Sequence, residues 1–270
     1  MLSIRPAAVA GMFYPEAPAT LAADIQAYLG KAVAPTTATS WPKALIVPHA
    51  GYVYSGPIAA SAYRRLAAHA DAIRRVVLFG PTHRVAMQGL ALPSARAFAT
   101  PLGVVEIDTD AVASALRLAQ VRKSDAAHAL EHSLEVQLPF LQTVLGRFRI
   151  VPFAVGDASA VQVAEVIELL WNDPGTLVVV SSDMSHYLRY SEARALDRAT
   201  ADSVLALSAT LHGEQACGAI PVNGLLVAAR RRGLRPELID LRNSGDTAGD
   251  KSRVVGYAAF AFTEAEHDRS

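Results

Sequence analysis

The chain has 270 residues, which is long for one domain, yet α/β folds of this length often form a single domain around one sheet. Apolar residues make up 51% of the chain and charged residues 19%, so the composition supplies a large core and excludes disorder over most of the length. Twenty-five Lys and Arg residues balance 25 Asp and Glu residues, which excludes a basic field for binding nucleic acid or anionic lipid. We expect one domain spanning residues 1–270.

Short β-branched runs alternate with helix-like stretches along the chain. The predicted strands are 44–47, 75–79, 149–155, 176–180 and 254–262. The predicted helices are 20–29, 58–70, 110–119, 160–170, 191–207 and 222–232. The strands are continuous apolar runs, which is typical of strands buried on both faces. The pattern therefore predicts an α/β fold with a central sheet covered by helices on both faces.

Three of the predicted strands run directly into a loop that carries a histidine. These histidines are His49, His83 and His186. Side chains just beyond the carboxyl ends of strands in an open α/β sheet meet in one crevice, where ligands bind. Imidazole is a common metal ligand and titrates near neutral pH. The placement therefore predicts one site, for a metal ion or for proton transfer.

Asp183 stands three residues before His186, so a turn would place both on one face. The functional interpretation is a carboxylate that orients the imidazole as an acid, a base or a partner of a metal ligand. The structural interpretation is an aspartate that caps a helix beside an unrelated histidine. The residues alone leave both open.

His132 lies between two glutamates, in Glu131-His-Ser-Leu-Glu135. On a helix, Glu131 and Glu135 would share a face. A solvated first turn, with acids that complement the helix dipole, is the simpler interpretation, and the histidine makes the segment a candidate for the site. No second histidine follows four residues later, which excludes the zinc protease motif His-Glu-x-x-His.

Cys217 is the only cysteine, and it stands just before a predicted helix. A position near a helix N-terminus lowers the pKa of a thiol and favours a thiolate ligand or nucleophile. The alternative is a small buried apolar side chain. The remaining histidines lack such a context, and we expect structural or solvent-exposed positions for His69, His128, His212 and His267.

The same cysteine bears on the compartment, because an unpaired thiol fits a reducing environment. Arg5 and two prolines interrupt the first 15 residues, so they make a poor signal peptide. No run of about 18 apolar residues lacks a charge or a breaker, and we expect no membrane-spanning helix. We expect a cytoplasmic protein.

Several motifs, taken in order and spacing, resemble the Memo family, whose bacterial and archaeal members are called AmmeMemoRadiSam system protein B. The resemblance covers nearly the whole chain. The motifs are Arg5-Pro-Ala, Gly11-Met-Phe-Tyr-Pro15, Pro48-His-Ala-Gly-Tyr52, Gly80-Pro-Thr-His83, Glu131-His-Ser-x-Glu135 with Leu138-Pro139, Ser181-Ser-Asp-Met-Ser-His186, Cys217-Gly with Pro221, and Asn243-Ser-Gly-Asp-Thr247.

The resemblance implies a fold like that of class III extradiol dioxygenases, which are non-haem Fe(II) enzymes. It also implies a metal ion, most readily Fe(II), bound by His49, His83 and Cys217. By the same resemblance, His132, Asp183 and His186 line the site as acid, base or orienting groups. Mononuclear Fe(II) oxygenases commonly use two histidines and a carboxylate, whereas a thiolate ligand also suits copper or zinc.

Two functions follow as hypotheses. The first is a metal-dependent, dioxygenase-like oxidoreductase acting on a small oxygen-bearing substrate, with a zinc hydrolase as a variant of the same site. The second is a non-catalytic protein that binds a peptide or a partner, and the resemblance implies a radical-SAM protein and an AMMECR-like protein as its associates. Tyr52, Tyr54 and Tyr187 would contact such a ligand.

Overall fold

Four parallel strands form the centre of the main sheet in the computed structural model, which describes residues 3–32 and 41–264. The four are β2 (Ala44–Val47), β9 (Thr176–Ser181), β3 (Arg75–Pro81) and β8 (Arg149–Val155), in that order across the sheet. Their residues are almost all buried, because both faces of the sheet are covered. The strands predicted at these positions are confirmed.

Antiparallel strands extend the sheet on both sides of this parallel centre. Strand β12 (Val254–Thr263) pairs with β2, and both β10 (His186–Leu188) and β11 (Arg235–Asn243) pair with β12. On the other side, β4 (Leu90–Leu92) runs antiparallel to β8, and β7 (Val121–Lys123) runs parallel to β4. A second, three-stranded sheet contains β1 (Ile4–Arg5), β5 (Ala97–Thr100) and β6 (Gly103–Glu106).

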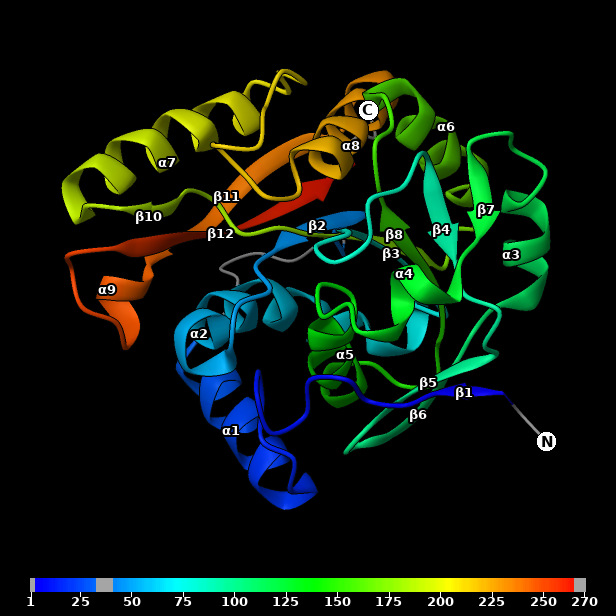
Figure 1. Ribbon diagram of the computed structural model, residues 1–270, viewed down its shortest axis with the longest axis horizontal. Helices are drawn as coiled ribbons and strands as arrows, with labels where there is room; N and C mark the ends of the chain where they lie inside the picture. Colours follow the sequence, from blue (N-terminus) through cyan, green and yellow to red (C-terminus); the bar gives the residue numbers. More distant parts are fainter. Residues whose placement is uncertain (1–2, 33–40, 265–270) are drawn as a thin grey trace, which may run out of the picture.

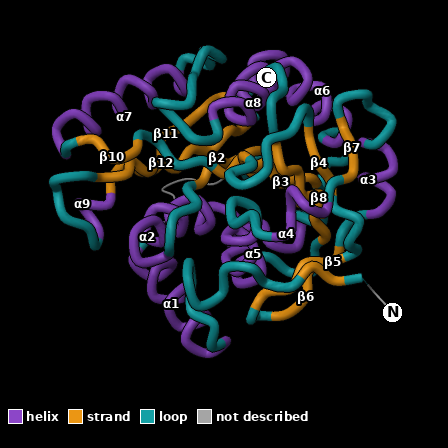
Figure 2. The backbone as a smooth tube through the Cα atoms, in the orientation of Figure 1, coloured by secondary structure: helices purple, strands orange, loops and turns teal. Residues whose placement is uncertain are grey.

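Helices cover both faces of the main sheet, as expected for an α/β fold (Figure 1). One face carries α6 (Ala160–Leu170), α7 (Tyr190–Leu205) and α8 (Ala219–Arg232), with α3 (Thr109–Ala115) beside α6. The other carries α1 (Pro18–Lys31), α2 (Tyr52–Tyr63), a 3-10 helix (Arg64–Ala72) and α5 (Leu138–Val144). Figure 2 shows the strands as a layer between these two groups. The short elements are α4 (Asp125–Ala129), a 3-10 turn (Glu135–Gln137) and α9 (Ser244–Thr247).

Two predicted helices differ from the observed ones. The helix expected over 58–70 begins at Tyr52 and ends at Tyr63, after which the chain continues as a 3-10 helix. Pro57 lies inside this helix, where it lacks the N–H that would donate to the Val53 carbonyl. The helix expected over 110–119 ends at Ala115. None of the described helices is long and apolar enough to cross a membrane.

The strand register brings several loops to one edge of the sheet. Val47 at the end of β2 is paired with Ser181 at the end of β9, and Phe79 of β3 is paired with Val180. His49, Asp183 and His83 each lie two residues beyond the last residue of their strand. These three side chains therefore start from neighbouring points at the carboxyl edge of the parallel strands.

Candidate metal centre

Three histidines meet at the carboxyl edge of the sheet. One ring nitrogen from each of His49, His83 and His132 lies within 4.8 Å of the other two. The centroid of the His49 ring is 5.2 Å from that of His83 and 5.3 Å from that of His132, and the His83 and His132 rings are stacked at 4.5 Å. Side chains from three separate loops thus present donor atoms to one point, which is the arrangement that a metal ion requires.

Glu131 orients two of these rings from behind. Its Oε1 is 2.9 Å from His83 Nδ1 and 3.3 Å from His132 Nδ1. It also accepts hydrogen bonds from the backbone N–H groups of His83, His132 and Ser133. A carboxylate only accepts, so Nδ1 of His83 carries a proton, and in the neutral ring the lone pair is on Nε2.

The charge of Glu131 is maintained although the side chain is buried. Burial alone would raise the pKa of Glu131, but the hydrogen bonds from the ring and backbone of His83 and from Ser133 outweigh burial and lower the pKa to about 2. Burial also lowers the pKa of His132 to about 4, and His83 adds to that shift. Glu131 is therefore ionised and His132 neutral at pH 7, which are the states that metal ligation requires.

His49 is held in the same tautomer by a different group. Ser181 Oγ donates to the carbonyl of Ser133 at 2.5 Å and accepts from Gln137 Nε2 at 2.8 Å. With its proton committed to Ser133, the hydroxyl accepts from His49 Nδ1 at 2.9 Å. His49 Nε2 is then the lone-pair nitrogen, and it lies 3.2 Å from Cys217 Sγ.

Cys217 lies beside His49, just before α8. Its backbone N–H donates to the carbonyl of Asp183, and the Asp183 N–H lies 3.3 Å from its Sγ. Gly218 is required here, because a Cβ at that position would lie 2.7 Å from Ser182 Cβ. Burial, reinforced by the Asp183 charge, raises the pKa of the thiol to about 12, so the pKa decrease expected from the helix N-terminus is wrong for the metal-free protein.

Asp183 does not hold His186 in the manner anticipated. The buried Asp183 Oδ1 accepts from the His49 backbone N–H at 2.7 Å. Burial raises the pKa of Asp183 to about 7, against the opposing effect of backbone N–H groups of His49 and Ala50. In the described chain no hydrogen bond joins Asp183 to the His186 ring, because the carboxylate points toward the loop after β2. His186 itself begins β10, partly exposed, and burial lowers its pKa.

The glutamates around His132 depart from the sequence expectation. Glu131 and Glu135 are both buried, and the chain between them is a turn rather than the solvated first turn of a helix. Tertiary hydrogen bonds decide this, because Glu131 binds the histidines and Glu135 binds the N-terminal segment. The sequence does not mark Glu131 as an orienting group, because its only signal is a pair of glutamates, Glu131 and Glu135, on either side of a histidine.

A comparison with known families decides the classification. A family model described as "Memo-like protein" matches residues 5–261. The chain belongs to the Memo family. It is 37% identical to a MEMO1 family protein of Methanopyrus kandleri, over 96% of this chain and 98% of that one. It is 39% identical to one of Archaeoglobus fulgidus (94% and 97%) and 36% identical to one of Aquifex aeolicus (97% and 100%).

A solved structure shares the fold of this Memo family protein. The structure, "uncharacterized protein JW3007 from Escherichia coli K12", superposes with a TM-score of 0.50 at 13% identity, covering 82% of this chain and all of that one. At this identity the likeness concerns the fold alone. It supports the α/β class predicted from the alternation of strands and helices.

The remaining histidines of this Memo family protein occupy other places. His128 is buried, with Nε2 2.9 Å from the Ala91 carbonyl, so it has a structural role. His212 is exposed, as expected, and His69 lies in the 3-10 helix after α2. His267 lies outside the described residues.

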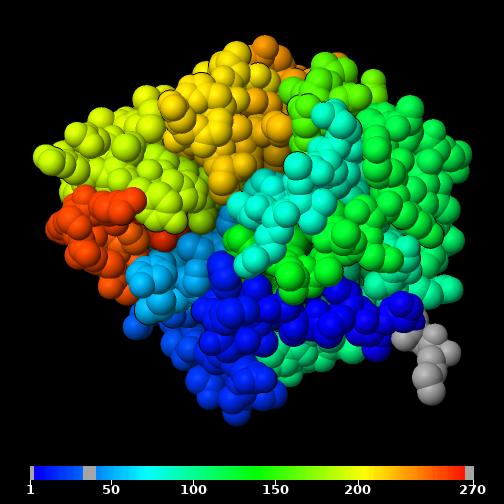
Figure 3. Space-filling model, in the orientation of Figure 1, coloured from blue at the N-terminus to red at the C-terminus, as the bar shows by residue number. Residues whose placement is uncertain are grey.

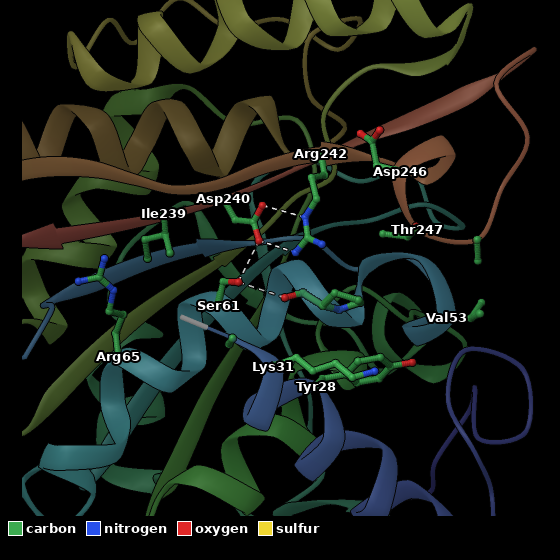
Figure 4. A pocket seen from close by; sticks show the side chains of 13 residues that line it. Tyr28, Lys31, Val53, Ser61, Arg65, Ile239, Asp240, Arg242, Asp246 and Thr247 are labelled. Atoms are coloured by element: carbon green, nitrogen blue, oxygen red, sulfur yellow. Dashed lines mark hydrogen bonds and ion pairs between the residues drawn. The ribbon is translucent and has the colours of Figure 1, made fainter. Parts of the chain in front are cut away.

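A cavity of about 860 Å³ lies away from the histidines, between α1, α2, β11 and α9 (Figure 4). Arg242 Nε donates to Asp240 Oδ1 at 2.9 Å, and Ser61 donates to the same carboxylate at 2.9 Å. The family motif Asn243–Thr247 comprises the N-cap and the four residues of α9, and it contributes Asp246 and Thr247 to the lining. Asp240 is thus paired with Arg242 and Ser61, and the described lining of this cavity holds no histidine or cysteine.

Proposed function

We propose that this Memo family protein binds a metal ion through His49, His83 and His132, with Cys217 as a further ligand, and uses it as a dioxygenase-like oxidoreductase. The observation that carries the proposal is the cluster of three imidazoles within 4.8 Å, with Nδ1 of His49 and His83 facing Ser181 and Glu131. Three imidazoles and a thiol form a donor set that transition metals favour.

The ligand set is open to a direct test. The family resemblance implies His49, His83 and Cys217, whereas the three-histidine cluster adds His132. Metal binding at Cys217 requires loss of the thiol proton, which a bound cation favours. We expect His49→Ala to abolish stoichiometric metal binding. His132→Ala and Cys217→Ser should each lower the metal affinity. His212→Ala, an exposed histidine, is the matched control. Full metal occupancy in His49→Ala would contradict the assignment.

We assign the metal as Fe(II), on the family's resemblance to the class III extradiol dioxygenases. Fe(II), when bound, supplies a redox-active centre that accepts oxygen donors. Metal analysis of anaerobically purified protein tests the assignment, and stoichiometric iron is the expected result. Stoichiometric zinc or copper without iron would contradict it, and zinc would favour the hydrolase variant.

The groups that remain free around the cluster are candidates for moving protons. His186 is partly exposed and is not a member of the three-histidine group. Asp183, with its pKa raised to about 7, can take up or release a proton near neutral pH. We expect oxygen consumption with a panel of catechols to depend on His186, tested as His186→Gln. No turnover with any substrate would remove the oxidoreductase proposal and favour a binding role.

The second candidate function is the binding of a peptide or a protein partner. Tyr187 is 63% exposed and Tyr54 39% exposed, and they flank the segments that carry His186 and His49. Tyr52 is buried and donates to the Val136 carbonyl, so its expected role in ligand contact is wrong. By family resemblance, the partners are a radical-SAM protein and an AMMECR-like protein. Calorimetric titration with these purified proteins is the test, and Tyr187→Ala should weaken binding without changing metal content.

A further inference from the structure

The N-terminal arm, residues 3–17, is fastened to the segment 128–135 by a buried arginine. Arg5 donates from Nε to the His128 carbonyl at 2.8 Å and from Nη2 to the Glu131 carbonyl at 2.7 Å. Its Nη1 forms an ion pair with Glu135. The planar guanidinium thus connects three points of one loop, which a single ammonium group could not do.

Glu135 completes the attachment from the other side. Its Oε1 accepts from the Val9 N–H at 3.0 Å and from the Tyr14 hydroxyl at 2.5 Å, and its Oε2 accepts from the Ala8 N–H at 2.8 Å. This carboxylate is fully buried, and all of these donors belong to the arm. Figure 3 shows the arm, in dark blue, lying against the green middle of the chain. Segment 128–135 is therefore held at several of its residues by the same stretch of chain.

The residues between these attachment points are the ones that face the metal centre. Glu131 and His132 lie between His128 and Glu135, and Arg5 binds the carbonyl of Glu131 itself. The arm also touches His132 directly, because the Phe13 ring lies 4.5 Å from the His132 ring, centroid to centroid. A small shift of this loop would move the His132 ring and also the carboxylate that orients His83.

Gly11 shapes the arm for this contact. Its φ of +78° allows a turn in which Gly11 N donates to the Tyr14 carbonyl at 2.8 Å. The turn sets Phe13 over His132 and Tyr14 on Glu135. Both N-terminal motifs, Arg5-Pro-Ala and Gly11-Met-Phe-Tyr-Pro15, thus contact the segment 128–135 beside the candidate metal centre.

We propose that Arg5 is a positioning residue of this site: it fixes segment 128–135 so that Glu131 and His132 face His49 and His83. A buried ion pair with a purely structural role would change stability and leave the ligand geometry alone. The inference rests on the proposed metal-binding function, and the test below separates the two.

Cobalt(II) titration of the metal-free full-length protein is the first readout, because the visible absorption of bound cobalt reports ligand geometry. We expect Arg5→Ala to lower the affinity by about 10- to 100-fold, the range seen for groups that orient ligands, and to change the spectrum. Arg5→Lys keeps the positive charge but lacks the planar guanidinium, so its cobalt affinity should lie between those of the wild type and Arg5→Ala. Arg75→Ala, at the opposite edge of the sheet, should bind as the wild type does.

The second readout needs no metal. The ¹⁵N shifts of the imidazoles in the metal-free protein report the Glu131 contacts of His83 and His132, and Arg5→Ala or Arg5→Lys should alter them. If the wild type binds no cobalt, the proposed function fails while these shifts still decide the role of Arg5. A folded Arg5→Lys with unchanged shifts and unchanged cobalt affinity would overturn the inference, even if Arg5→Ala does not fold.

Discussion

The parallel strands carry polar groups at both edges, and the two edges use them differently. At the amino edge, Arg75 of β3 pairs with Asp108 at 2.8 Å and Asp173 at 3.4 Å, and Arg149 of β8 approaches Glu106 at 3.8 Å. At the carboxyl edge, His49, His83 and His132 gather around buried hydrogen-bond partners. Opposite charges neutralise each other at the first edge, whereas the second edge presents neutral imidazole nitrogens, one of which, His49 Nε2, faces the Cys217 thiol.

The two edges differ in the bonding capacity that their polar groups leave open. The ion pairs of the amino edge leave no unmet bonding capacity, whether partly buried, as for Arg75 and Asp108, or exposed, as for Arg149 and Glu106. At the carboxyl edge Nδ1 of His49 and Nδ1 of His83 are hydrogen-bonded, and a thiol is the one described group within hydrogen-bond distance of their Nε2 atoms, so a cation could take that place. Candidate binding edges are thus distinguished by which donor atoms remain free, and not by how many polar residues they contain.

The largest expected effect is the loss of Glu135 near the carboxyl edge. Glu135→Ala leaves Arg5 buried without a counter-ion, so we expect a loss of about 3–5 kcal/mol in unfolding free energy, measured by urea denaturation. Asp108→Ala at the amino edge removes a helix cap and a partly exposed ion pair, for which about 1–2 kcal/mol is expected. Equal losses at the two edges would remove the contrast.

The next effect is the pH dependence that His128 contributes. Burial lowers the pKa of His128 from 6.5 to about 4, so the unfolded chain binds this proton more tightly. The contribution of neutral His128 to the unfolding free energy is therefore fully present above pH 6.5. It is lost as the pH falls toward 4, by roughly 3 kcal/mol for a shift of this size. Urea denaturation of chelator-treated wild type and His128→Gln at pH 7 and 4.5 measures it, and parallel pH profiles would contradict it.

Glu131→Gln should act on the metal centre more than on the fold. The amide cannot provide the ionised acceptor that His83 and His132 share, so we expect cobalt(II) affinity to fall by about 10- to 100-fold. The matched control is Glu165→Gln on the exposed side of α6. The assigned role of Glu131 is excluded if both variants titrate with the wild-type affinity.

The smallest effect is expected at the amino edge itself. Arg149 and Glu106 are both about half exposed, so Arg149→Ala should change unfolding free energy by less than about 0.5 kcal/mol. It should leave metal affinity unchanged. A measurable loss of metal binding would mean that the two edges are coupled through β8.

Much of the fold could be predicted because its central strands are buried on both faces. Strands β2, β3, β8, β9 and β12 are apolar runs that no other element of this length matches. Strand β11 was missed, because Arg235, Glu237, Asp240 and Arg242 give it the composition of a loop. Its strand conformation comes from antiparallel pairing with β12, which its own residues do not predict.

The site could be predicted from the sequence only for residues whose positions follow from nearby strand ends. His49 and His83 follow strand ends, so their convergence follows from the parallel sheet. The motif that contains His132 pointed to the site but suggested a helical face, since nothing nearby in sequence reveals that Glu131 and Glu135 are buried. Arg5 could not be placed, because its partner is 130 residues away.

These long separations also govern when the site can form during synthesis. Arg5 and Glu135 are 130 residues apart, and His49 and Cys217 are 168 apart. The thiol cannot reach His49 until β9 has joined the sheet and the start of α8 has left the ribosome. Early histidines in the emerging chain lack their partners, so the proposed metal could be captured only after folding, from the cations that the finished protein meets.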